Sequence, residues 1–420
     1  MMNISFSPPD ITEAEIKEVV DALKSGWITT GPRVKKLEQH IAEMVEVGLT
    51  ENGIPRCVCL NSQTSCAELA LHVLGVGALC GGSCEDEVIV PAYTYTASAS
   101  VVNHVGAKLV LIDSAKDSIG LDYDAVYNAI NEHTKAIIPV DIGGVPCDYD
   151  RLSEIVDAKK TLFNPNGDIQ KAIGRVIILA DAAHALGAEY KGKKVGSVAD
   201  FSAFSFHAVK NLTTGEGGAL VWKHIDGVDD ENIYKTLQLL SLHGQSKDAL
   251  AKTRLGAWEY DVVAPWYKCN MTDIAAAMGL AQFKRLPGLL HRRKEIIERY
   301  DAAFKPLGVK SLPHFMPEYS SSGHLYITRL FNKDGTPINN ETRNAIMDEM
   351  AKRGIACNVH YKPLPMHTAY KNLGYDIKNF PNAYSYFINE ITLPLNTCLT
   401  DEEIEYIIAN YCDVVKRLCK

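Results

Sequence analysis

Short runs of apolar, often β-branched residues recur along the first two thirds of the chain, and segments with helical periodicity separate several of them. Runs without polar alternation are typical of strands that are buried on both faces. Because strands and helices alternate, we expect an α/β fold with a mostly parallel sheet and helices on both faces. The predicted strands are 56–60, 86–91, 107–113, 135–141, 174–181, 201–206 and 218–222. The predicted helices between them are 65–79, 95–106 and 148–160.

The pattern changes near residue 270. Residues 272–304 have the periodicity of a long helix, which we expect to break at Pro287 because proline lacks the backbone N–H of a helix interior. Near the C-terminus, an amphipathic helix is predicted to start after Thr400, an N-cap residue followed by three acidic residues. Strand-like runs lie between the two helices, at 323–331 and 391–396.

This change of pattern predicts two domains. We expect a large α/β domain at 1–265 and a smaller α+β domain at 266–420, which agrees with the usual size of protein domains. Residues 161–174 are rich in Asn, Gly and Pro at their centre and are predicted to form a surface loop.

Composition narrows the classes of partner. The 420 residues are 46% hydrophobic and 22% charged, with a formal net charge of −8. An acidic chain argues against nucleic acid as the main partner, so an anionic ligand has to be held by a few local groups. The first residues lack the basic segment and apolar core of a signal peptide, and the apolar runs fall short of a membrane span. We therefore expect a cytoplasmic protein that does not bind the membrane.

The chain has eleven cysteines, an odd number in a sequence without secretory features. Reduced thiols are therefore expected rather than disulfides. The close pairs are Cys57 with Cys59 and Cys80 with Cys84, and neither has a second pair at the spacing of a zinc site. No metal is expected.

Lys210 lies between the predicted strand 201–206 and the glycines of "TTGEGG". A lysine that forms a Schiff base needs a partly desolvated position and a close turn of the backbone beside it. A surface lysine at the end of a strand is the ordinary alternative.

Two further residues fall near the same edge of the predicted sheet. Asp181 ends the strand "VIILAD", and ligands of parallel sheets bind at the carboxyl ends of strands. Its carboxylate suits pairing with a protonated pyridine nitrogen, with a helix N-cap as the alternative. His184 is placed to stack on such a ring or to bond to its hydroxyl, or else to pack in the core.

Hydroxyl and aromatic residues follow the first two strands. Thr64 and Ser65 stand at the expected start of a helix, where free N–H groups and hydroxyls make an anion site, although the same hydroxyls serve equally for N-capping. Tyr95 follows the second strand and is placed either to lie against a cofactor ring or to pack in the core.

Together these segments resemble the DegT/DnrJ/StrS family of nucleotide-sugar aminotransferases, which are pyridoxal 5'-phosphate (PLP) enzymes with the aspartate aminotransferase fold. The most specific match runs from Asp181 to Gly218. The segments that carry the resemblance are "WITTGPRVKKLE", "NSQTSCAELAL", "VPAYTYTASA", "DAAHALGAEYKGKKVGS", "SFHAVKNLTTGEGGA", "YKCNMTDIAAAMGLAQ", "HLYITRL", "FPNAYSY" and "ITLPLN".

The resemblance implies roles for the matching residues. Lys210 is expected to bind PLP covalently and to move protons, Asp181 to pair with the ring nitrogen, Tyr95 to stack on the ring, and His184 to lie near the ring hydroxyl. The residues expected to hold the phosphate are Thr64, Ser65 and Ser205.

The family is usually dimeric, and each active site is completed by the neighbouring subunit. Many members have "YNYRMTD" where this chain has "YKCNMTD". The asparagine that reaches across to the phosphate is therefore replaced by Lys268, and the arginine by Asn270. A lysine still offers the phosphate a point charge.

The expected reaction is transfer of an amino group from an amino acid, by family habit glutamate, to a keto sugar on a nucleoside diphosphate. The resemblance favours a 4-keto-6-deoxy sugar of UDP or dTDP, and a product used in polysaccharide, glycan or antibiotic assembly.

Thr29, Thr30 and His324 are candidate substrate contacts, with turn hydroxyls and a strand-edge histidine as the alternatives. Arg329 is expected to form a cross-strand ion pair more readily than to bind the donor carboxylate.

Three other interpretations remain. In the family, a PLP-dependent sugar dehydratase replaces the lysine with histidine, and this chain has Lys210. A PLP enzyme such as a cysteine desulfurase is expected to have a reactive cysteine on a mobile loop, which no segment here marks out. A non-catalytic sugar-nucleotide sensor is expected to lack the lysine or the aspartate, and both are present.

Overall fold

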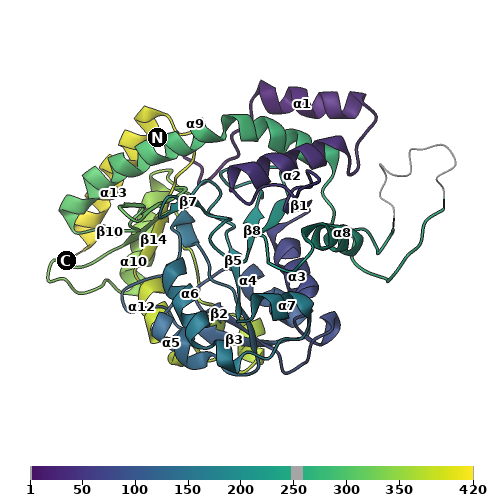
Figure 1. Ribbon diagram of the computed structural model, residues 1–420. Helices are drawn as coiled ribbons and strands as arrows, with labels where there is room; N and C mark the ends of the chain where they lie inside the picture. Colours follow the sequence, from purple (N-terminus) through teal and green to yellow (C-terminus); the bar gives the residue numbers. More distant parts are fainter. Residues whose placement is uncertain (1, 247–258, 420) are drawn as a thin grey trace.

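The computed structural model describes residues 2–246 and 259–419 (Figure 1). Within these residues seven strands form the main sheet, in the order β1-β9-β8-β5-β4-β2-β3. They are β1 (Cys57–Leu60), β2 (Glu87–Pro91), β3 (Lys108–Ile112), β4 (Thr134–Ile137), β5 (Ile177–Asp181), β8 (Phe201–Ser205) and β9 (Gly218–Trp222). Only β9 runs against its neighbours, β1 and β8, in this sheet of the described residues. The predicted strands and the mostly parallel α/β sheet are confirmed.

Alternate residues of each strand pack against different helices, which is why the strands are apolar throughout. Val58 and Leu60 face one core, and Cys57 and Cys59 face another. The helices on the first face are α3 (Gln63–Val73), α4 (Ala97–His104), α7 (Asp168–Ile173) and α8 (Asp230–Ser241). Those on the second are α2 (Pro32–Met44), α5 (Tyr123–Ala129), α6 (Tyr149–Ala158) and the start of α9 (Asp273–Phe304).

A smaller antiparallel sheet lies in the last third of the chain, in the order β10-β13-β14. Its strands are β10 (Lys310–Ser311), β13 (Tyr326–Arg329) and β14 (Glu390–Leu393). The helices of this part are α10 (Asn340–Lys352), α11 (Thr368–Asn372), α12 (Pro381–Phe387) and α13 (Asp401–Leu418). The predicted cap of α13 is confirmed, because Thr400 and Glu403 form a capping box at its start.

A third sheet, in the order β11-β12-β6-β7, joins the two parts of the chain. Its strands are β6 (Glu189–Tyr190), β7 (Lys193–Lys194), β11 (Phe315–Met316) and β12 (Tyr319–Ser320). Here β12 pairs with β6, so a strand from the last third of the chain hydrogen-bonds to one that follows β5.

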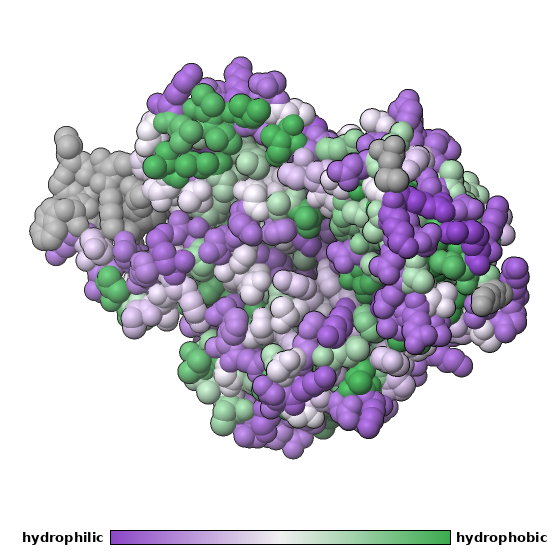
Figure 2. Space-filling model, turned by 180° about the vertical axis from the view of Figure 1, so that it is seen from behind, coloured by the Kyte–Doolittle hydropathy of each residue, from purple (hydrophilic) through white to green (hydrophobic). Residues whose placement is uncertain are grey.

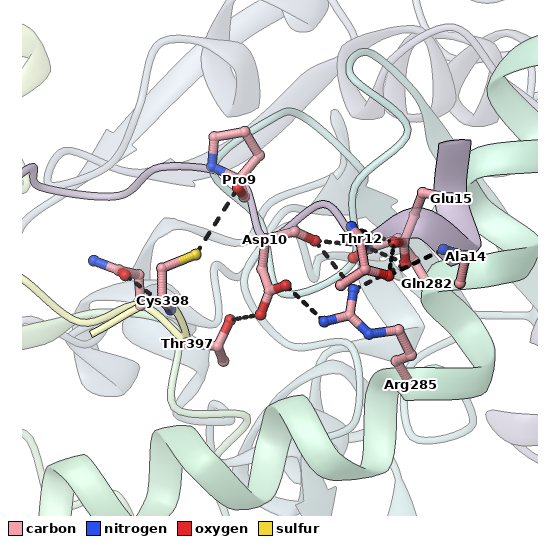
Figure 3. Close-up of polar contacts among 10 residues, drawn as sticks. Pro9, Asp10, Thr12, Ala14, Glu15, Gln282, Arg285, Thr397 and Cys398 are labelled. Atoms are coloured by element: carbon pink, nitrogen blue, oxygen red, sulfur yellow. Dashed lines mark hydrogen bonds and ion pairs between the residues drawn. The ribbon is translucent and has the colours of Figure 1, made fainter. Parts of the chain in front are cut away.

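The N-terminal segment leads to α1 (Glu13–Lys24), which packs along α9 (Figure 1). Arg285 on α9 forms ion pairs of 2.6 Å with Asp10 and 2.9 Å with Glu15 (Figure 3). Gln282 donates to the Asp10 carbonyl at 2.8 Å, and Thr397 donates to the Asp10 carboxylate at 2.6 Å. These contacts fasten the segment before α1 both to α9 and to the chain just before α13.

Two predictions about elements are wrong. The long helix does not break at Pro287: α9 runs through it, because Leu286 and Leu289 are buried and packing on both sides offsets the missing backbone hydrogen bond. The predicted loop at 161–174 contains α7, in which the buried Gln170 donates to the Leu74 carbonyl at 2.7 Å. That tertiary contact holds a helix too short to be stable on its own.

Across residues 2–246 and 259–419, each helix is too short or too polar to cross a lipid bilayer. All eleven cysteines are free thiols, among them the pairs at 57/59 and 80/84.

Candidate active site

A cavity of about 460 Å³ opens beside the carboxyl ends of β5 and β8. Its size is that of a small-molecule site, and its place in the sheet is where ligands of such folds bind. The lining residues are Ser62, Gln63, Thr64, Thr94, Tyr95, Ala97, Val140, Asp181, Ala183, His184, Ser205, His207, Val209, Lys210, Glu216, Gly217, His360 and Tyr361.

Lys210 lies in the turn after β8, where its backbone N–H donates to the His207 carbonyl at 2.9 Å. A Cβ on Gly217 would lie 2.2 Å from the Thr214 hydroxyl, and one on Gly218 would lie 2.6 Å from the backbone nitrogen of Gln63. Gly217 is therefore needed within the turn itself, and Gly218 is needed for the start of β9 to approach the start of α3. Burial lowers the pKa of the Lys210 amine to about 8, although the nearby Asp181 carboxylate opposes the shift.

Asp181 ends β5 with its carboxylate on the cavity. One oxygen accepts a hydrogen bond from the Ser98 hydroxyl at 2.7 Å, and the other accepts from the Ala183 N–H at 3.1 Å. Burial raises the pKa of this carboxyl, and the two hydrogen bonds limit the rise. A turn follows β5 rather than a helix, so the N-cap interpretation of Asp181 is wrong.

His184 is buried at the cavity wall. Its Nδ1 accepts a hydrogen bond from the Gly143 N–H at 3.1 Å, and its Nε2 lies 3.2 Å from the Tyr361 hydroxyl. Burial and the positive Lys210 lower the pKa of His184 well below its usual value, so the ring is neutral. Because Nδ1 is an acceptor, the ring proton is on Nε2 and is donated to Tyr361.

The first turn of α3 faces the cavity through Thr64. Ser62 is the N-cap and accepts from the Ser65 N–H at 3.1 Å, so Thr64 and Ser65 do not cap this helix. The Ser65 hydroxyl donates to the Asn61 side chain at 2.8 Å and is not part of the lining. Ser205 lines the cavity from the end of β8. The unpaired N–H groups of a helix start, with hydroxyls beside them, suit a phosphate.

Tyr95 also lines the cavity and is 59% exposed, so its interpretation as a core residue is wrong. Its ring lies 5.8 Å from that of Tyr361, centroid to centroid. A flat, accessible ring at this position can stack on a planar ligand.

The other candidate residues lie away from the cavity lining. Lys268 hydrogen-bonds to Asn270, and Asn270 donates to the Thr30 hydroxyl at 2.6 Å. Thr29 is exposed and its carbonyl accepts from the Asp273 N–H at 3.0 Å. The side chains of Lys268, Asn270 and Thr30 form a hydrogen-bonded cluster outside the cavity lining.

Two candidates from β13 and the turn before it are buried. The His324 ring lies behind His184, with 4.3 Å between the ring centroids, and so meets the cavity only through that residue. Arg329 forms an ion pair of 3.4 Å with Asp117 and donates to the Asn389 side chain at 3.1 Å. The ion pair is formed as predicted but not across the strands, since the acidic cross-strand neighbour of Arg329 is Glu390.

Sequence reasoning missed part of the lining, above all His360 and Tyr361. These two residues come from the last third of the chain, in a loop before the prolines of "HYKPLP". A histidine and a tyrosine side by side in a proline-rich loop were the available signal. Nothing in the local pattern says that the loop folds back onto β5.

Comparison with known proteins gives a consistent result. A family model described as the DegT/DnrJ/EryC1/StrS aminotransferase family matches residues 9–411. The spore coat polysaccharide biosynthesis protein SpsC of Bacillus subtilis is 35% identical over 415 residues, which cover 98% of this chain and 97% of SpsC.

Solved structures agree over the same length. A putative sugar aminotransferase of Streptococcus pneumoniae, in its PMP form, has a TM-score of 0.92 and 55% identity and covers 99% of this chain and 100% of its own. Its PLP form has a TM-score of 0.91 and 52% identity, with 100% of both chains covered. Helicobacter pylori PseC, an aminotransferase involved in the biosynthesis of pseudoaminic acid, has a TM-score of 0.82 and 27% identity, with 99% and 100% covered.

Proposed function

Because the chain belongs to the DegT/DnrJ/EryC1/StrS aminotransferase family, we propose that it is a PLP-dependent enzyme that transfers an amino group to a nucleotide-linked keto sugar. Glutamate is the proposed donor, and a 4-keto-6-deoxy sugar of UDP or dTDP is the proposed acceptor. The amino sugar formed would serve polysaccharide or glycan assembly, a proposal that the relatives named for spore coat polysaccharide and pseudoaminic acid support.

The observation that carries the proposal is the pairing of Lys210 with Asp181 in one cavity. Lys210 has an amine that is half neutral near pH 8, as a nucleophile toward an aldehyde requires. Asp181 offers a buried carboxylate to a protonated ring nitrogen, and Tyr95 offers a flat face to the ring. We assign the phosphate to the start of α3, with Thr64 and Ser205 as ligands.

We assign a separate role in the proposed reaction to each of the residues around the cavity. When bound, PLP withdraws electrons from the carbon that loses its proton. The Lys210 amine is placed to take that proton and to return one to the acceptor side. Asp181 holds the positive charge of the ring nitrogen, and Ser98 keeps the carboxylate in place. His184, neutral and fixed by Gly143, orients its neighbours without adding charge.

We also propose that the enzyme works as a homodimer with shared active sites. Figure 2 shows an apolar area over α1, the helix that carries Ile16, Val20 and Leu23, which are 37 to 52% exposed. Such an area on a protein surface marks an interaction site. The proposal gives the cluster of Lys268 and its neighbours a role, since these side chains lie outside the cavity of their own subunit and would serve that of the partner.

An absorbance spectrum followed by borohydride reduction tests the proposal. We expect a visible band that reduction removes, and a pyridoxyl group on Lys210 in the mapped peptide. K210A should lose at least about 10³-fold in glutamate-dependent turnover because both the covalent link and the proton carrier are gone. The exposed Lys284 provides the control K284A, which should keep its activity.

A protein that stays colourless with added PLP, or a K210A variant with normal turnover, contradicts the proposal. The first result would place the sugar-nucleotide sensor ahead of the enzyme.

A further inference from the structure

The loop that carries His360 and Tyr361 brings two polar rings to the cavity from the C-terminal part of the chain. Behind His360 lie two buried residues of β14, Glu390 and Thr392. The Thr392 hydroxyl donates to the Glu390 carboxylate at 2.5 Å. The hydroxyl oxygen of Thr392 also lies 3.0 Å from Nδ1 of His360. A chain of hydrogen bonds therefore runs from β14 to the cavity wall.

The direction of each bond in this chain follows from the ionised form of Glu390. Burial raises the pKa of the Glu390 carboxyl to about 7, so the ionised form prevails above pH 7. It then accepts from the Thr392 hydroxyl, and the backbone N–H of His360 points at both of its oxygens, at 3.2 and 3.3 Å. The single proton of Thr392 is used toward Glu390, so its oxygen accepts from Nδ1–H of His360. Burial and the charge of Lys210 lower the pKa of His360 to about 4, which leaves the ring neutral. Its Nε2 is then a bare acceptor, and no described residue bonds to it.

Tyr361 offers a hydrogen-bond donor to the cavity, whereas His360 offers an acceptor. His184 donates its Nε2–H to the Tyr361 oxygen, because its Nδ1 is occupied by the Gly143 N–H. The hydroxyl proton of Tyr361 is therefore free to be donated to a ligand. Two consecutive residues thus present one acceptor and one donor to the cavity, and their rings lie 5.0 Å apart at 81°.

We propose that His360 and Tyr361 are the residues that recognise the keto sugar: Nε2 of His360 accepts from the hydroxyl next to the ketone, and the Tyr361 hydroxyl donates to the ketone oxygen. This inference rests on the proposed function. Thr392 and Glu390 are positioning residues that act through His360, since they fix which of its nitrogens carries the proton.

The pair predicts a specificity. A site built to bond to a hydroxyl rejects an analogue without it, because a buried acceptor is then left without a partner. The enzyme should therefore distinguish a keto sugar with a hydroxyl beside the ketone from its deoxy counterpart. A sugar with the same nucleotide and ketone but no neighbouring hydroxyl should be a poor substrate.

Kinetics with two sugars tests the contact directly. The holoenzyme is converted to its amino form with glutamate and given dTDP-4-keto-6-deoxyglucose or its 3-deoxy analogue, or the UDP counterparts. The wild type should have up to about 100-fold lower kcat/KM for the analogue, the cost of one buried acceptor left without a partner. H360F, which keeps a ring against Phe6, should lose about the same factor on the full sugar and no longer distinguish the two. A variant that still distinguishes them overturns the proposal.

The positioning role has its own test. T392V removes the acceptor from Nδ1–H, and T392S restores it. We expect T392V to raise KM for the full sugar about 10-fold with a smaller change in kcat, and T392S to recover most of it. An equal loss in both variants, or a KM for T392V within twofold of wild type, means that Thr392 has only a structural role and contradicts the chain of bonds.

A final measurement does not depend on the substrate. In the holoenzyme with ¹⁵N-labelled histidine, the His360 signals, assigned with H360Q, should show a protonated Nδ1 and a bare Nε2, and T392V should shift the proton to Nε2. A protonated Nε2 in the wild type overturns the proposal. If no keto-sugar nucleotide is converted, the proposed function and its sugar contact both fail, whereas a protonated Nε2 with normal sugar turnover rejects the recognition pair alone.

Discussion

At the scale of single residues, the central group of the cavity is the Lys210 amine, whose pKa is lowered by burial. Lys210 has a carboxylate, Asp181, as its charged neighbour, and two neutral histidines, His184 and His360, face the same space. Burial thus keeps the Lys210 amine reactive near neutral pH, which is the kind of perturbed pKa that functional sites show.

The pH dependence of PLP uptake follows from this balance. The neutral amine is the reactive form, and burial lowers the pKa of Lys210 to about 8, so the rate at which the apoprotein takes up PLP should rise through pH 8 and level off above it. D181N removes the charge that raises this pKa, so its midpoint should lie below that of wild type. Stopped-flow absorbance measures both curves.

The exposed Asp226 supplies the control, since D226N should keep the wild-type midpoint. A midpoint in D181N at or above that of wild type would contradict the assigned coupling.

At the scale of elements, α9 is held by its surroundings in spite of Pro287. The proline removes one backbone hydrogen bond, and its exposed ring makes little packing in return. P287A should raise the free energy of unfolding by about 1 to 2 kcal/mol, less than the full penalty of an interior proline because the more flexible alanine also favours the unfolded chain. Urea unfolding measures the change.

The neighbouring Gly288 serves as the comparison, because it has open space around it and G288A should gain no more than about 1 kcal/mol. A loss of stability in P287A would mean that the proline is required for the path of α9.

The attachment of α1 to α9 depends on Arg285 and Glu15. Burial alone would raise the pKa of Glu15, but hydrogen bonds from Thr12 and Arg285 outweigh it and the pKa falls below its usual 4.5. Since Glu15 is charged above that pKa, R285M should cost about 2 kcal/mol at pH 7, because a buried carboxylate loses its positively charged partner. The cost should shrink as the pH falls through the lowered pKa and Glu15 takes up a proton.

The free energy of unfolding is measured for R285M and for the exposed control K284M, each at pH 7 and at pH 3.5. The comparison separates the loss of the charge on Arg285 from the effect of replacing any long basic side chain with methionine. An equal cost at both pH values would show that packing, and not charge, holds the segment.

At the scale of the whole molecule, the apolar face of α1 predicts an assembly. I16D with L23D should convert the proposed dimer to a monomer, because each aspartate would be buried without a partner at the interface. Light scattering after gel filtration measures the mass, and PLP affinity measured on the same samples should fall if the subunits complete each other's sites. A wild-type protein that is monomeric contradicts the shared-site proposal.

The sequence allowed much of the fold to be predicted. Strands buried on both faces have to be apolar throughout, so β1 to β5, β8 and β9 are visible as runs, and the cap at Thr400 is set by side chains three residues apart. Lys210, Asp181, His184 and Tyr95 could be named because each ends or follows a predicted strand, and the ends of parallel strands meet at one edge of the sheet.

The rest was decided by contacts between distant parts of the chain. The continuous α9 and the short α7 depend on packing that overrides local preference, as the buried Gln170 illustrates. Ser65 and His324 belong to matching motifs, yet hydrogen bonding turns the first to Asn61 and burial places the second behind His184. His360 and Tyr361 reach the cavity from a loop about 150 residues beyond Lys210, and their donor and acceptor roles are set by partners on other elements. Local sequence thus determined the strands and the reactive residues at their ends, whereas the tertiary structure alone decided which side chains share the cavity and where their protons lie.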